Sequence, residues 1–456
     1  MFAVIKRLFG IGVAMIGLTG AALAGSGATD PFVASMEAAL QKNPKIIAAA
    51  AQLKAALERL PQSRALLMPT LDLNASRGHS RLEWSGGGSS STDPAVVGLS
   101  LTQSLFNQKA LVGFRQTKPY IASVEQDAQA AIQAVFLEAA STAVEVLQAS
   151  EVVRLAKNNR ELLKHHLEAT RSRFKVGEIT RTDVSQAESR LASAEANLVR
   201  SENTLAVARA RFQEVTGGPV PEGLHLPGFR DKLDDLPRSE LQTRAAERPD
   251  LVAAILRLKV AEDEVDLKRA GHMPSVALSA KASRNWGEEI SNTIDPVNKY
   301  AVDLGVTVPI YAGGMVVSQT AEALARQEAQ AAEVERLRLQ ITREVEAAAL
   351  DLHSARAADV ALETALKAAD DALDGVDREY RVGTRTALDL LDARNEAFSA
   401  ETELAKSRFG MVNSGFRLLH AMGRLTLEAL TLNPPQTGDR PSRESSDRDS
   451  PKPPRR

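Results

Sequence analysis

The chain contains the same arrangement of segments twice, and this duplication constrains its fold more than any other feature. Residues 68–73 (MPTLDL) recur as residues 273–278 (MPSVAL), and residues 174–177 (FKVG) recur as residues 380–383 (YRVG). The two copies lie about 205 residues apart, and their proline and glycine residues stay in register. Chance similarity between alanine-rich helices would not keep that register. The sequence therefore predicts one structural unit that occurs twice.

Each unit is predicted to run in the order helix, two strands, long helix, turn, helix. The first helix of unit one covers residues 31–67, and the long helices cover about 109–174 and 314–381. At 1.5 Å per residue, such a helix is on the order of 100 Å long, more than a compact domain needs. Aromatic residues make up only 4% of the chain, which suits long helices that pack on each other as coiled coils.

The predicted domain organisation has five parts. Lys6 and Arg7, an apolar run that is too short to span a bilayer, and a small-x-small site ending at Ala24 indicate a secretory signal peptide. Proline, serine and charged residues dominate the last segment, which is predicted to be disordered. The parts are a signal peptide (1–24), a first repeat (25–218), a linker (219–237), a second repeat (238–432) and a tail (433–456).

Four segments alternate between apolar and small polar residues, which is typical of strands. They cover about 69–82 and 95–106 in the first unit, and about 274–284 and 300–310 in the second. Such strands suit a half-buried soluble sheet or a transmembrane barrel with a wet lumen. Four strands cannot close a barrel around water, so several subunits would have to contribute strands. The connections, residues 85–94 and about 287–298, are predicted to be polar loops.

Composition excludes several classes of function. Lys and Arg number 56 and Asp and Glu number 58, which argues against a nucleic-acid binder driven by positive charge. Cysteine is absent, so disulfides, thiolate metal sites and cysteine lipidation are ruled out. No enzyme motif or metal-binding spacing occurs, and His165 and His166 are interpreted as a solvated pair. We expect no enzymatic activity, cofactor or metal.

The two repeated turns carry the residues of most interest. Gly177 and Gly383 lie in turns that join a long helix to a shorter one. After the second turn, Asp389 and Asp392 are three residues apart and share one helix face, behind a possible N-cap at Thr386. Two readings stay open at this point. The carboxylates could be solvated groups that the helix dipole stabilises, or they could form a ring at a pore constriction.

With these motifs in view, the chain resembles the outer-membrane efflux and secretion proteins of the TolC family. The resemblance is carried by residues 173–177 (RFKVG), 380–386 (YRVGTRT), 389–393 (DLLDA) and 421–423 (AMG), and it covers about residues 31–432. It implies a mainly α fold with a small transmembrane β part. Three subunits with four strands each would share one β-barrel in the outer membrane, and their helices would form a coiled-coil barrel across the periplasm.

The resemblance also implies function and partners. The protein would be an outer-membrane channel that exports small molecules or proteins. Its partners would be two further copies of itself, a periplasmic adaptor, an inner-membrane pump or ABC transporter, and outer-membrane lipid. The alternative function is a periplasmic coiled-coil adaptor or scaffold without a pore, which accounts less well for the duplicated unit.

The resemblance finally implies roles for individual residues. Tyr380 is similar to a gate tyrosine that forms a hydrogen bond at the position of Asp183. Arg385 is similar to a gate arginine that pairs at Thr182. Asp389 and Asp392 are similar to two acidic rings that line the pore constriction and favour cations, which makes the ring the preferred reading of these two residues.

Overall fold

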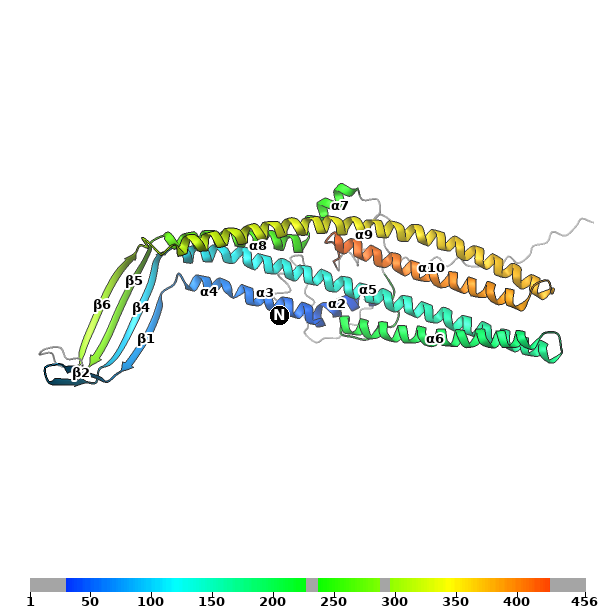
Figure 1. Cartoon of the computed structure of the whole chain (residues 1–456), viewed down its shortest axis with the longest axis horizontal. Coiled ribbons are helices and arrows are strands. Elements are labelled where there is room, and N and C mark those ends of the chain that lie inside the picture. Colours follow the sequence, from blue (N-terminus) through cyan, green and yellow to red (C-terminus); the bar gives the residue numbers. More distant parts are fainter. Residues whose placement is uncertain (1–29, 227–236, 288–295, 427–456) are drawn as a thin grey trace, which may run out of the picture.

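The computed structural model describes residues 30–226, 237–287 and 296–426. The chain is elongated, with strands at one end and two helical hairpins at the other (Figure 1). It is mainly helical with a small β part, as the sequence predicts. The signal peptide and the tail lie outside the described residues, as does part of the linker.

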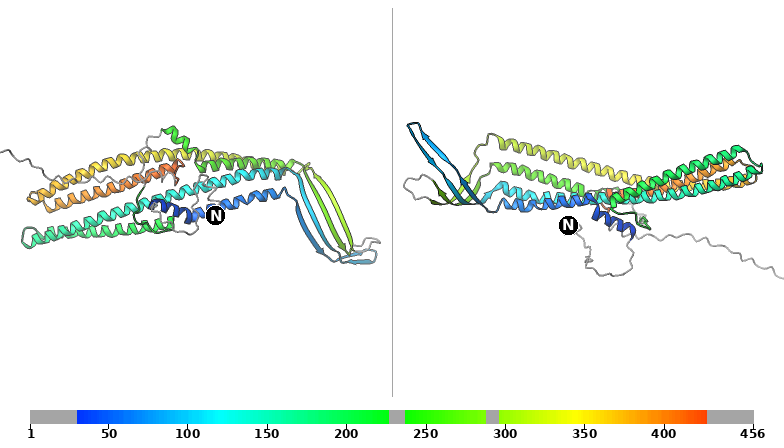
Figure 2. Two further views of the ribbon diagram at one scale, coloured as in Figure 1. Left: turned by 180° about the vertical axis from the view of Figure 1, so that it is seen from behind. Right: turned by 90° about the horizontal axis from the view of Figure 1, so that it is seen from below.

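The main sheet joins strands from both halves of the chain. Its antiparallel order is β1 (Thr70–Arg77), β4 (Ala95–Asn107), β5 (Ser275–Trp286) and β6 (Val297–Thr307). Consequently β1 and β6 are edge strands that pair on one side only. The sheet leaves the helices at an angle, and no described helix covers it (Figures 1 and 2).

One prediction in this region is wrong. Residues 80–92 were expected to end one strand and begin a polar loop, but they form a separate two-stranded sheet. Strand β2 (Ser80–Trp84) pairs with β3 (Gly88–Thr92) through a turn in which Gly87 has φ 86°. The glycines and serines here have low strand propensity, so the pairing depends on the tight turn, which brings the two segments together.

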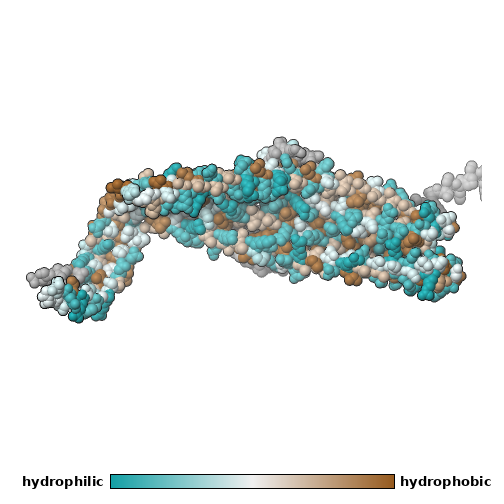
Figure 3. All heavy atoms as spheres, in the orientation of Figure 1, coloured by the Kyte–Doolittle hydropathy of each residue, from teal (hydrophilic) through white to brown (hydrophobic). Residues whose placement is uncertain are grey.

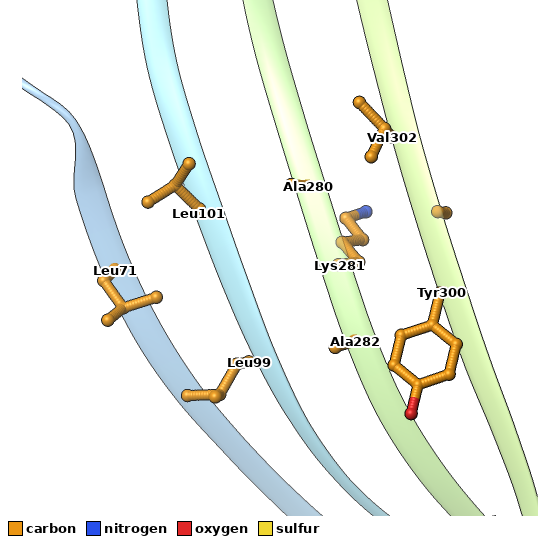
Figure 4. Close-up of a pocket in the computed structure, with 9 residues that line it drawn as sticks. Leu71, Leu99, Leu101, Ala280, Lys281, Ala282, Tyr300 and Val302 are labelled. Atoms are coloured by element: carbon orange, nitrogen blue, oxygen red, sulfur yellow. The ribbon is translucent and has the colours of Figure 1, made fainter.

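The alternation places the apolar side chains on one face of the main sheet. The register aligns Leu71 with Leu101 and aligns Leu99, Ala282 and Tyr300 across three strands. Figure 4 shows these side chains on the near side of the sheet, where they line a shallow hollow, while Lys281 points away. Leu71 is 66% exposed and Tyr300 is 80% exposed. The chain therefore has an apolar sheet face that it does not cover itself.

The predicted single helix over residues 31–67 is also wrong, because three helices lie there: α2 (Pro31–Lys42), α3 (Pro44–Leu57) and α4 (Arg59–Ala65). Asn43 has an extended backbone, caps α3 by accepting from the N–H of Lys45 at 2.9 Å, and donates to the carbonyl of Val215 at 2.9 Å. Pro61 lacks an N–H and cannot continue α3 past Leu57.

The long helices fold into two hairpins. The first hairpin comprises α5 (Gln108–Lys175, 68 residues) and α6 (Arg181–Thr216). The second hairpin comprises α9 (Met315–Arg381, 67 residues) and α10 (Ala387–Ala421). They lie side by side, with α5 in contact with α10. Between the hairpins and the sheet, α8 (Pro249–Arg269) packs on both α5 and α9, and α7 (Arg238–Ala245) packs on α9.

The hydrophobic core lies in the middle of the molecule. Phe32, Phe136, Phe212 and Phe416 come from four helices and are at most 2% exposed. The rings of Phe32 and Phe416 stack with centroids 6.0 Å apart, which joins α2 to α10. A second cluster between α7, α8, α9 and α10 includes Leu251, Ile341, Val345 and Leu418. These two clusters hold both hairpins together in the middle of the molecule.

Among the described residues, α5 alone is long and apolar enough to cross a membrane by length and composition. Nearly half of its apolar window is buried inside the chain. Val135, Phe136 and Ala139 of this helix belong to the core just described. A buried core helix passes the same test, so α5 by itself indicates no membrane span.

Candidate functional site

The candidate site is the helical tip, which we define as the two turns at 176–180 and 382–386 with the adjoining helix ends. Both turns have the same backbone: Gly177 has φ 81° and Gly383 has φ 82°. A left-handed conformation of this kind favours glycine. The N–H of Gly177 donates to the carbonyl of Phe174 at 3.0 Å, and that of Gly383 to Tyr380 at 3.1 Å. Both turns lie at the end farthest from the sheet (Figure 1).

A capping box begins each short helix. Thr386 caps α10 with its hydroxyl, which accepts from the N–H of Asp389 at 3.2 Å, and the Asp389 carboxylate accepts from the Thr386 N–H at 3.0 Å. Thr180 and Asp183 form the same box at α6, with distances of 3.3 and 2.9 Å. Each box satisfies two backbone donors that a helix N-terminus otherwise leaves open.

The capping box also sets the charge of Asp389. The backbone N–H and then the hydroxyl of Thr386, followed by the nearby Arg385, hold the pKa of this carboxyl below its ordinary value. Hydrogen bonds to the charged form stabilise that form. Asp389 is therefore ionised at neutral pH in the single chain.

Near the tip, two side-chain pairs connect the hairpins. The guanidinium of Arg173 on α5 donates to the hydroxyl of Tyr380 on α9 at 3.1 Å and lies 5.3 Å from its ring centroid. Arg190 on α6 binds the carboxylate of Asp392 on α10 at 2.6 Å. Asp392 is therefore paired with a residue that the sequence analysis did not identify.

The predicted partners of the gate residues differ from those in the chain. Within the described residues, neither the bond between Tyr380 and Asp183 nor the bond between Arg385 and Thr182 forms. The carboxylate of Asp183 instead accepts from the N–H and the hydroxyl of Thr180, at the start of its own helix. Arg385 instead binds Glu379 on the same hairpin at 2.8 Å, because a long side chain in a tight turn reaches its own helix first.

The interpretation of His165 and His166 as a solvated pair is half wrong. The side chain of His165 is 73% exposed and lies 3.6 Å from Glu168. His166 faces the second hairpin, where its ring centroid is 6.5 Å from that of Tyr380. Neighbouring side chains of a helix point about 100° apart. This periodicity could have shown from the sequence that His165 and His166 lie on different sides of the helix. No group of three potential metal ligands occurs among the described residues.

Comparison with known proteins gives a consistent assignment. Residues 36–218 and 241–424 match the sequence profile described as "Outer membrane efflux protein". The chain is 26% identical to "Outer membrane protein TolC" of Vibrio cholerae, over 85% of this chain and 89% of the relative. It is 29% identical to "Outer membrane efflux protein BepC" of Brucella suis, over 74% of each.

Solved structures share the fold. The crystal structure of the Campylobacter jejuni CmeC outer membrane channel superposes with a TM-score of 0.77 and covers 92% of this chain and 95% of that one. The two sequences are 17% identical, so this likeness concerns the fold alone.

The capping box generates a prediction about the tip. Thr386→Ala removes the N-cap of α10 and should destabilise its first turn by about 1 kcal/mol. Hydrogen exchange of residues 387–392 should then be about fivefold faster in native protein. Thr364→Ala is the control, because its hydroxyl bonds only within exposed α9, to the carbonyl of Val360. Equal exchange in wild type and Thr386→Ala would show that the box does not hold the turn.

Proposed function

The chain belongs to the outer membrane efflux protein family and is an outer-membrane channel for efflux or secretion, and from this premise we propose that three copies form one export duct. Each copy contributes one four-stranded sheet to a twelve-stranded barrel in the outer membrane. Its helices contribute one third of a tube that crosses the periplasm. The family likeness of residues 36–218 and 241–424 supports two equivalent repeats in each subunit.

The observation that carries this proposal is the incomplete sheet. It has two unpaired edges, β1 and β6, and an exposed apolar face. Backbone groups at a sheet edge cannot remain unpaired in lipid. Pairing β6 of one copy with β1 of the next satisfies both edges, and three copies close the ring. The apolar face then contacts lipid, and Trp84, Trp286 and Tyr300 lie near the distal strand ends as an aromatic belt.

The long helices supply a second argument. Leu339, Leu350 and Val360 on α9 are 63–67% exposed in the single chain, and apolar residues lie among polar ones along the helical body (Figure 3). These exposed apolar side chains are available for burial against a partner. In the proposed trimer, that partner is the neighbouring copy.

The helical tip is proposed to be the constriction and the gate. Three copies bring six carboxylates, Asp389 and Asp392 from each chain, to one narrow end of the duct, where they favour cations. Arg173–Tyr380 and Arg190–Asp392 hold the two hairpins of one chain together. Arg385, Thr182 and Asp183 are proposed to make their gate contacts with the adjacent subunit.

The duct needs partners at its periplasmic end. We propose that a periplasmic adaptor and an inner-membrane pump or ABC transporter dock at the tip and supply the energy for export. The predicted signal peptide agrees with an outer-membrane protein that reaches into the periplasm. The alternative of an adaptor or scaffold without a pore does not agree with the family, whose members are transport proteins. Membership of this family also gives no support for an enzymatic activity.

Membrane fractionation tests this proposal first. The outer-membrane fraction should contain a species of three chains on a denaturing gel without boiling, and boiling should convert it to single chains, each somewhat smaller than the 48.9 kDa of the full sequence because the predicted signal peptide is removed. Edge-to-edge strand pairing makes such assemblies resistant to detergent. A monomer in the soluble periplasmic fraction would overturn the shared barrel.

Carboxylates at the constriction should determine ion selectivity. Asp389→Ala with Asp392→Ala removes six negative charges from the trimer and leaves Arg190 unpaired in each chain. We expect lower cation selectivity and weaker block by multivalent cations in a planar bilayer. Glu403→Ala is the control, since this carboxylate binds Lys406 on the same helix. Selectivity equal to that of wild type would place the constriction elsewhere.

Loosening the gate should raise conductance. Tyr380→Phe removes the hydroxyl that accepts from Arg173, and Arg385→Ser removes the guanidinium at the turn. The double variant should conduct more in a planar bilayer, because fewer contacts oppose separation of the hairpins. Arg171→Ser provides a matched control: this arginine binds Glu188 within the first hairpin alone. Wild-type conductance in the double variant would exclude these residues from the gate.

A further inference from the structure

Four side chains form a cluster between the hairpins, within about three helical turns of the tip. We define the hairpin cluster as His166 and Arg173 on α5, Tyr380 on α9 and Arg394 on α10. His166 lies against the Tyr380 ring from one side, and Arg173 donates to the Tyr380 hydroxyl. The cluster therefore spans both hairpins, so its interactions act on their separation.

His166 is the unusual member of this cluster. Its Nε2 atom is buried and makes no hydrogen bond within the described residues. Burial, then the charge of Arg394, then that of Arg173 lower the pKa of His166 below its ordinary value. All three effects oppose a positive charge on the ring. The imidazole is therefore neutral at neutral pH, and its neutrality lets two arginines lie near it.

The carboxylates around the cluster are already paired. Asp377 on α9 binds Arg381 at 2.6 Å and lies 3.9 Å from Arg394. In the first tip turn, Glu178 lies 4.0 Å from Arg173. From α6, Arg190 faces α10 and binds Asp392. A protonated His166 would therefore meet two arginines and no unpaired acid among these groups. A buried charge without a partner is strongly unfavourable.

We propose that His166 is a proton sensor of the helical tip: its protonation adds a third positive charge beside Arg173 and Arg394 and loosens the contact between the two hairpins. Acid in the periplasm then favours the open tip. The inference rests on the proposed export channel and adds a regulation to its gate. The proposed sensor requires no bound ligand, and its four side chains all lie among the described residues.

The sign and the pH window follow from linkage. In an open tip His166 is exposed and has an ordinary pKa of about 6.5. In the closed tip its pKa is lower, so the open state binds the proton more tightly. Above about pH 6.5 both states are neutral and pH has no effect. As the pH falls below that value, the population of the open state increases. The increase ends when His166 is protonated in the closed state as well.

Two measurements on the full-length trimer test the sensor between about pH 7.5 and about pH 5, where histidine titrates. The first is conductance in a planar bilayer. The second is the distance between nitroxide labels on Val176→Cys and Val382→Cys, one in each tip turn and both more than 70% exposed. The chain has no native cysteine that would add a label. Asp389 stays ionised in this range because its pKa is lowered.

Wild type should conduct more at the acid end and show longer distances between the labels. His166→Gln keeps a neutral polar group and should lose both responses. His166→Arg carries a permanent charge and should be open already at about pH 7.5. His165→Gln is the control, because this neighbour is exposed and faces away from Tyr380; its acid response should equal that of wild type.

The outcomes separate the two proposals. If the purified protein forms no conducting trimer at neutral pH, the export channel itself fails. If the trimer conducts and His166→Gln keeps the full acid response in both measurements, the channel stands and the proton sensor is overturned. A response that disappears in His165→Gln and not in His166→Gln would also overturn it.

Discussion

Satisfaction of backbone hydrogen bonds at the sheet edges is the constraint on which the rest of the molecule depends. Strands β1 and β6 have unpaired edges, and the apolar face between them, from Leu71 to Tyr300, lies open. A single chain in lipid could not leave the backbone groups of these two edges unpaired. In the proposed trimer, neighbouring copies pair with both edges and lipid covers the apolar face. The same closure would hold the helices that follow each strand side by side. The proposed helical tube would then follow from the proposed barrel, since α5 begins directly after β4.

The sequence predicts the regular parts of this fold because local rules govern them. Alternation indicates the strands, and the glycines at 177 and 383 mark turns that need a positive φ. The break at Asn43 depends on a hydrogen bond to Val215, far away in the chain, and the β2–β3 pair depends on a turn rather than on strand-forming residues. Arg190 and Asp392 are likewise distant in sequence, so only the folded hairpins bring them together.

The two hairpins share a backbone and differ in chemistry. Both begin their short helix with a Thr–Asp capping box. Six residues after the capping threonine, the first hairpin has Gln186 where the second has Asp392; six residues before it, Phe174 stands where the second has Tyr380. The cross-hairpin bonds need the hydroxyl and the carboxylate, so the second hairpin alone supplies these acceptors. The two hairpins thus have the same backbone scaffold, and single side chains that differ between them make the contacts that join them.

Packing explains why motion should concentrate at the tip. The phenylalanine core and the cluster around Ile341 bury large side chains in the middle of the molecule. Beyond it, Leu163, Ala194 and Leu391 form a small cluster between the hairpins, supported by the two cross-hairpin side-chain pairs. Regions with few buried apolar contacts open at lower free energy than the core. The hairpins can therefore separate at their ends while the middle stays packed, so the proposed opening would leave the sheet end of the chain unchanged.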